Sequence, residues 1–138
     1  MIYYAHSMKI YDSVAESEEF KFIKDYFKDS DVINPNGDIK WGGTMKPYLA
    51  AVERSNMVVM SEYKGHVGRG VYEEALVALE HNIPVRCIRR DKNGQLLVVN
   101  INDLRKADRN DWAIKYAKVK EEEKDSKESS GNSTSTSR

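Results

Sequence analysis

The segment around Glu74 carries the side chains of this 138-residue chain that are best suited to chemistry. Two glycines, Gly68 and Gly70, lead into a stretch of helical periodicity that places Glu74 one turn inside it. Glycines at a helix start let the backbone approach a ligand closely and offer free amides to an anion. A carboxylate at that place can attack an electrophilic sugar carbon or stabilise positive charge developing on it. The same spacing also fits an exposed glutamate that only stabilises the helix N-terminus.

Three neighbours of Glu74 have chemistry of their own. Glu73 is a competing carboxylate, because adjacent residues of a helix cannot face the same way. Arg69 has the fork geometry to bind a ligand phosphate, although it also fits a solvated loop arginine. His66 can act as an acid near neutral pH, or be an exposed loop histidine.

Alternating apolar and polar segments must position these residues. Short apolar runs predict strands at residues 1–5, 31–35, 56–60, 83–89 and 96–101. Helical spacing predicts helices at residues 13–28, 44–54, 70–81 and about 102–120, the first opened by a capping box from Ser13 to Glu16. We therefore expect one α/β domain over residues 1–120, a parallel flavodoxin- or Rossmann-like sheet with helices on both faces. Residues 121–138 are polar throughout and are expected to form a disordered tail.

Ligands of parallel sheets bind beyond the carboxyl ends of the strands, where the strand order switches. Three loops should meet there, after the first, second and third strands. Asn34 also fits a turn former, and Trp41, beside two glycines, fits either a lid over the site or a packing residue. The expected binding residues are His6, Ser7, Asn34, Ser61, His66, Gly68, Arg69 and Gly70.

Composition excludes several classes of function. The 22 basic and 22 acidic side chains balance, and a nucleic-acid binder normally carries a basic excess, so we expect no nucleic-acid partner. Cys87 is the one cysteine, which rules out an intrachain disulfide, and the three histidines lack metal-ligand spacing, so we expect no metal and no cofactor. With no membrane-spanning run and no signal peptide, a cytoplasmic protein is expected.

The run from Gly70 to Glu74, followed by Ala78 and by Pro84-Val85, resembles the signature of nucleoside 2-deoxyribosyltransferases and related deoxynucleotide N-hydrolases. The first strand, with Tyr3, and the apolar strand at residues 56–60 resemble further parts of that family, so the likeness spans about residues 1–85. The resemblance implies that Glu74 is a nucleophile that takes a deoxyribosyl group covalently, that Tyr3 holds its carboxylate, and that the protein forms a homo-oligomer.

The resemblance leaves two functions of the pocket open, beside a weaker third alternative, a scaffold or interaction protein whose pocket is vestigial. The first is cleavage or transfer at the N-glycosidic bond of a nucleoside or nucleotide. The second is a module that binds a nucleotide or an ADP-ribose-like ligand without turning it over. The second remains open because the family usually carries aspartates in two segments that read Ser55-Asn56 and His66-Val67-Gly68 here.

Overall fold

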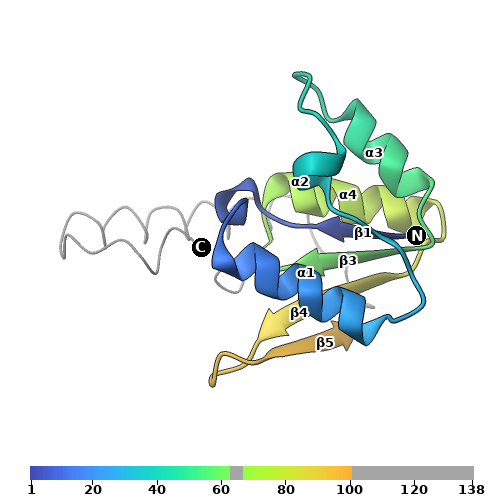
Figure 1. Cartoon of the computed structure of the whole chain (residues 1–138). Coiled ribbons are helices and arrows are strands. Elements are labelled where there is room, and N and C mark those ends of the chain that lie inside the picture. Colours follow the sequence, from blue (N-terminus) through green and yellow to red (C-terminus); the bar gives the residue numbers. More distant parts are fainter. Residues whose placement is uncertain (63–66, 101–138) are drawn as a thin grey trace.

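Five strands form one sheet in the order β2-β1-β3-β4-β5 (Figure 1). The computed structural model describes residues 1–62 and 67–100. Its strands are β1 Ile2–Ala5, β2 Val32–Ile33, β3 Met57–Ser61, β4 Val85–Arg90 and β5 Leu96–Asn100. The first four run parallel, which confirms the α/β class expected from the alternation of strand and helix segments.

The last strand corrects the expectation of a fully parallel sheet. β5 pairs with β4 in the antiparallel direction, from Arg86 opposite Asn100 to Arg90 opposite Leu96. The link between them is a tight turn, in which the Asp91 carboxylate accepts from the Asn93 amide at 2.8 Å. So short a connection returns the chain beside itself, whereas a parallel pair needs a crossover of a dozen residues or more.

Three of the described helices begin and end within two residues of the expected bounds, and a fourth, Pro35–Asp38, was not expected, because its first residue was assigned to the strand at residues 31–35. The helices are α1 Val14–Tyr26, α2 Pro35–Asp38, α3 Lys46–Glu53 and α4 Arg69–Glu80, with a 3-10 turn, η1, at Met8–Ile10. Ser13 caps α1 by accepting from the Glu16 amide at 3.2 Å. Glu16 reaches back as a capping box requires, although it accepts from the amide of Asp12, at 3.0 Å.

Alternation along the strands divides the core between the two faces of the sheet. Tyr3 and Met60 pack on the side of α3 and α4, whereas Tyr4 and Val59 pack on the side of α1. Figure 1 shows the same division, with α1 on one side and α3 and α4 on the other. Helices therefore cover both faces, as expected, and consecutive residues of β1 serve different faces.

Two expectations fall outside the described residues: the helix at about 102–120 and the polar tail at 121–138. Within the described ranges, no helix has the length and apolar character that a membrane crossing requires.

Candidate functional site

The strand order changes direction at the carboxyl ends of β1 and β3. From β1 the chain passes through α1 to β2 at one edge, and from β2 it returns past β1 to β3 on its other side. The connections therefore leave neighbouring strand ends in opposite directions and open a crevice between them. The loop after β1 and the start of α4 both reach this crevice.

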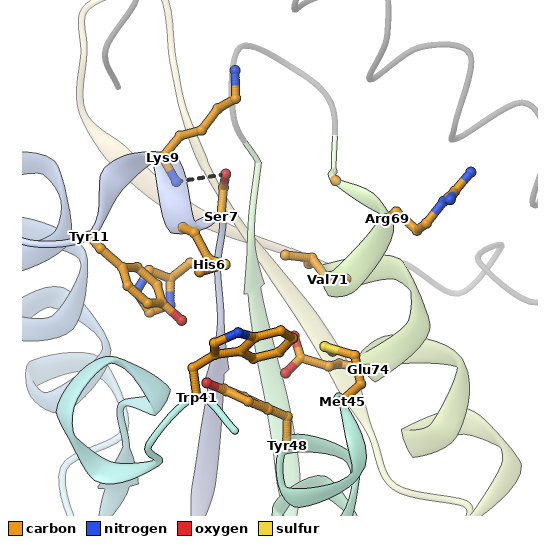
Figure 2. Close-up of a pocket in the computed structure, with 13 residues that line it drawn as sticks. His6, Ser7, Lys9, Tyr11, Trp41, Met45, Tyr48, Arg69, Val71 and Glu74 are labelled. Atoms are coloured by element: carbon orange, nitrogen blue, oxygen red, sulfur yellow. Dashed lines mark hydrogen bonds between the residues drawn. The ribbon is translucent and has the colours of Figure 1, made fainter. Parts of the chain in front are cut away.

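A pocket of about 350 Å³ occupies this position (Figure 2). That volume lies in the range of small-molecule sites. Its wall comes from three segments: the loop after β1, the approach to α3 with its first turns, and the start of α4. The lining residues are His6, Ser7, Met8, Lys9, Tyr11, Trp41, Met45, Tyr48, Gly68, Arg69, Gly70, Val71 and Glu74.

Glu74 lies in the pocket wall and is held there by Tyr3. The Tyr3 hydroxyl donates a hydrogen bond to Glu74 Oε2, joining β1 to α4 across 71 positions of sequence. Tyr3 is fully buried and Glu74 is 5% exposed, so both belong to the core as well as to the site. Of the described residues that line the pocket, Glu74 is the one carboxylate.

Burial sets the charge of Glu74. Loss of water around the carboxylate, the largest influence, raises the pKa of Glu74 to about 8, with a smaller contribution from the charge of Glu73. The hydrogen bond from Tyr3 acts in the opposite direction and lowers the pKa of Glu74, because it favours the charged form. At pH 7 the protonated form of Glu74 therefore predominates.

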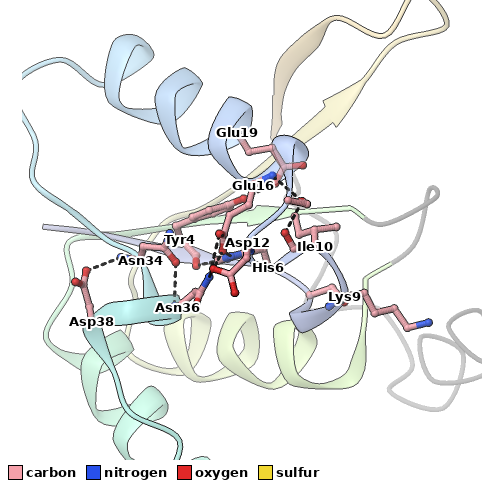
Figure 3. A network of polar contacts seen from close by, with 12 residues as sticks. Tyr4, His6, Lys9, Ile10, Asp12, Glu16, Glu19, Asn34, Asn36 and Asp38 are labelled. Atoms are coloured by element: carbon pink, nitrogen blue, oxygen red, sulfur yellow. Dashed lines mark hydrogen bonds and ion pairs between the residues drawn. The ribbon is translucent and has the colours of Figure 1, made fainter. Parts of the chain in front are cut away.

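A polar network holds His6 at the end of β1 (Figure 3). Its Nε2 lies 2.6 Å from Glu16 Oε2 and its Nδ1 lies 3.1 Å from the Tyr4 carbonyl oxygen. Its ring stacks on that of Tyr4 with the centroids 3.7 Å apart. Asn36 closes the network by donating from Nδ2 to both carboxylate oxygens of Glu16 at 3.0 Å. Burial lowers the pKa of His6, although the bonds to Glu16 and Tyr4 oppose that shift.

Five of the expected binding residues lie in the pocket wall: His6, Ser7, Gly68, Arg69 and Gly70. Both ring nitrogens of His6 already contact protein groups, so His6 contributes a wall and not a free hydrogen bond. Ser7 caps η1 by accepting from the Lys9 amide at 3.1 Å. The Arg69 side chain is exposed and points away from Glu74 (Figure 2), so it lies at the mouth and not inside.

Two expected binding residues, Asn34 and Ser61, are not brought to the pocket. Asn34 caps α2 instead, accepting from the Asn36 amide at 2.9 Å, in line with its alternative reading as a turn former. Ser61 is buried on the α1 side, near the Glu19 carboxylate, because it follows Met60 on β3 and strand residues alternate between faces. His66 lies outside the described residues.

The sequence reasoning missed much of the pocket's aromatic and sulfur-containing wall. Tyr11 and Tyr48 fitted core and pocket equally well, and Met8 and Met45 gave no signal at all. Trp41 is 53% exposed, and its ring centre lies 5.9 Å from that of Tyr48. In Figure 2 its indole reaches from its loop over the pocket, which is the position that a lid would take.

Within residues 1–62 and 67–100, no cluster of histidine, cysteine and acidic side chains could hold a metal ion. Comparison with known proteins found no family model, no curated protein and no solved structure that matches the chain.

Proposed function

We propose that this pocket cleaves or transfers the N-glycosidic bond of a deoxynucleoside or deoxynucleotide, with Glu74 as the nucleophile. The observation that carries the proposal is the hydrogen bond from Tyr3 to Glu74 in the wall of a pocket at the strand ends. A nucleophilic carboxylate must point at the anomeric carbon, and a hydrogen-bond donor held on a buried strand fixes that orientation.

The reaction has two steps. In the first, an oxygen of ionised Glu74 bonds to the anomeric carbon while the bond from that carbon to the base nitrogen breaks. The bonding electrons stay with the nitrogen, which takes a proton from water. In the second step a water molecule, or the N–H nitrogen of another base, attacks the same carbon, gives up its proton to water and displaces the Glu74 carboxylate. Two displacements with a covalent intermediate replace a single one of higher barrier.

The pocket wall suits such a substrate. Trp41, Tyr48 and Tyr11 offer aromatic faces to a flat base, and Met8 and Met45 offer polarisable contacts. Arg69 and Lys9 flank the mouth, where each side chain could turn toward a phosphate on the substrate.

The proposal also includes a more specific assignment of the fold. The order β2-β1-β3-β4-β5 equals the flavodoxin-like order, in which ligands bind at the switch between β1 and β3. We propose a flavodoxin-like sheet whose last strand is reversed.

One observation favours a second candidate, a binding module without turnover. The raised pKa of Glu74 keeps most of its carboxyl groups protonated at pH 7, and a protonated carboxyl donates a hydrogen bond but is a poor nucleophile. Such a site would retain a nucleoside or nucleotide and release no base.

The test is incubation with a panel of 2′-deoxynucleosides and their 5′-monophosphates at pH 8, with free base measured by chromatography. We expect base release from the native protein and from Glu73→Gln, and loss of at least a hundredfold in Glu74→Gln. Glu73→Gln is the matched control because it changes the neighbouring carboxylate. If no base is released but a panel member raises the melting temperature, the binding module is the correct function.

A further inference from the structure

Tyr48 carries a hydroxyl whose place the proposed chemistry does not yet explain. The residue is 7% exposed and lies on α3 in the pocket wall. Within residues 1–62 and 67–100 its hydroxyl makes no hydrogen bond. Buried polar groups are nearly always paired, because desolvation of an unpaired hydroxyl costs free energy on the order of 1–3 kcal/mol. Its capacity to donate and to accept a hydrogen bond is therefore open to a ligand in the pocket.

Tyr11, which is partly buried, presents a second hydroxyl to the pocket. It lies on the opposite wall, and its hydroxyl also makes no hydrogen bond within the described part of the chain. In Figure 2 the hydroxyl ends of Tyr11 and Tyr48 point toward one another across the pocket. Burial, and next the nearby charge of Glu74, raise the pKa of Tyr11, so its proton stays in place and it acts as a donor.

Sugar hydroxyls are the groups that such a pair can bind. A phenol donates one hydrogen bond and accepts another, and an alcohol does the same, so the two groups satisfy each other. A deoxyribosyl group has one ring hydroxyl, at the 3′ carbon, and a 5′ oxygen that is esterified in nucleotides. With its anomeric carbon against Glu74, the sugar ring would lie between the walls that hold Tyr11 and Tyr48.

We propose that Tyr48, together with Tyr11, binds the 3′-hydroxyl of the deoxyribosyl group and holds the anomeric carbon against Glu74. This rests on the proposed function for the identity of the ligand. It makes Tyr48 a specificity-determining residue, since a ligand without the ring hydroxyl leaves a buried phenol unpaired.

The test removes the Tyr48 hydroxyl from the protein and the 3′-hydroxyl from the ligand, singly and together. Dissociation constants for 2′-deoxyadenosine and 2′,3′-dideoxyadenosine are measured by calorimetry for Glu74→Gln, which prevents turnover, and for the same protein with Tyr48→Phe added. Tyr26→Phe, which changes an exposed tyrosine on α1, replaces Tyr48→Phe in the control. We expect loss of the 3′-hydroxyl to weaken binding about tenfold with Tyr48 present and about threefold in Tyr48→Phe, where Tyr11 still binds that hydroxyl.

Equal losses with and without the Tyr48 hydroxyl would overturn the inference, as would binding of neither compound at millimolar concentration. A role in folding is tested separately: a structural hydroxyl would make Tyr48→Phe melt several degrees lower, whereas an unpaired one leaves the melting temperature unchanged or higher. The two proposals also fail differently. If the affinity lost with the 3′-hydroxyl depends on Tyr48 but the native protein releases no adenine, the sugar contact is supported and catalysis is refuted. If the native protein releases adenine but the affinity lost is the same with and without the Tyr48 hydroxyl, catalysis is supported and the sugar contact is refuted.

Discussion

At the scale of single residues, the structure gives the two carboxylate–tyrosine pairs of β1 different settings. Tyr3 donates to Glu74 beside the pocket, and Tyr4 donates to Glu19 at 2.5 Å on the α1 side of the sheet. Burial raises the pKa of both carboxyls. Of these two carboxylates, Glu74 lines the pocket and Glu19 does not, so position separates the proposed nucleophile from the structural carboxylate.

Glu74→Gln should change how stability depends on pH. Since the pKa of Glu74 rises from 4.5 to about 8 on folding, the folded protein holds this proton more tightly than the unfolded chain. The contribution of Glu74 to stability is therefore largest below pH 4.5 and is lost as the pH rises toward 8, by at most about 5 kcal/mol at ~1.4 kcal/mol per pKa unit. Urea unfolding at pH 5 and pH 8 should show the variant gaining stability over the native protein at the higher pH. Glu73→Gln should not reproduce the gain, and a difference that stays constant between the two pH values would contradict the assignment.

Tyr3→Phe should move the pH dependence of base release upward. The hydrogen bond from Tyr3 lowers the pKa of Glu74, so its loss leaves the carboxyl harder to ionise. We expect kcat/KM to rise about tenfold per pH unit below a midpoint near 8 in the native protein, and to reach its midpoint at higher pH in the variant. Tyr4→Phe, the matched change on the other face, should keep the midpoint. A midpoint that does not move in Tyr3→Phe would show that Tyr3 does not control this group.

At the scale of elements, Gly70 lies both in the first turn of α4 and in the wall of the pocket. A methyl group there would lie 3.8 Å from Met45 Cε, an ordinary contact. Gly70→Ala should raise stability by roughly 0.5–1 kcal/mol through helix propensity, and should raise KM because the methyl group narrows the pocket. Gly94→Ala is the opposite control: its φ of 81° strains an alanine, so stability should fall while KM stays the same. An unchanged KM in Gly70→Ala would contradict the pocket assignment.

The network around Glu16 fastens the end of β1 to α1 and α2. Glu16→Ala would leave His6 and Asn36 without their shared partner inside the protein. We expect a loss of about 2–4 kcal/mol in chemical unfolding, since breaking a buried polar network leaves its other members unsatisfied. Glu18→Ala removes an exposed pair with Arg90 and should cost less than about 1 kcal/mol. Similar losses in the two variants would contradict a buried structural role for the network.

At the scale of the whole molecule, local patterns predicted the elements well and their juxtaposition less well. Ser13 placed the start of α1, because a capping side chain acts within one turn. The reversal of β5 was missed, although the tight turn before it carried the information. Ser61 was assigned to the pocket because only its loop was considered, and the alternation along β3 turned it to the other face.

The residues of the site likewise divide into those that the sequence predicted and those that it did not. Glu74 and Tyr3 were found from spacing and resemblance together, and the structure joins them by a hydrogen bond. Tyr48 and Met45 were beyond reach, because an apolar or aromatic residue on a helix packs into a core and lines a pocket with the same spacing. Only the position of α3 beside α4 decides between the two.

The most direct test of the central claim is the mass of the protein during turnover. The native protein is mixed with 2′-deoxyadenosine at pH 8, quenched in acid within seconds, and digested for mass spectrometry. We expect a deoxyribosyl group to be added to the peptide that contains Glu74. This adduct should be absent in Glu74→Gln and present in Glu73→Gln. Adenine release without any adduct on that peptide, or at an undiminished rate in Glu74→Gln, would contradict a nucleophilic Glu74.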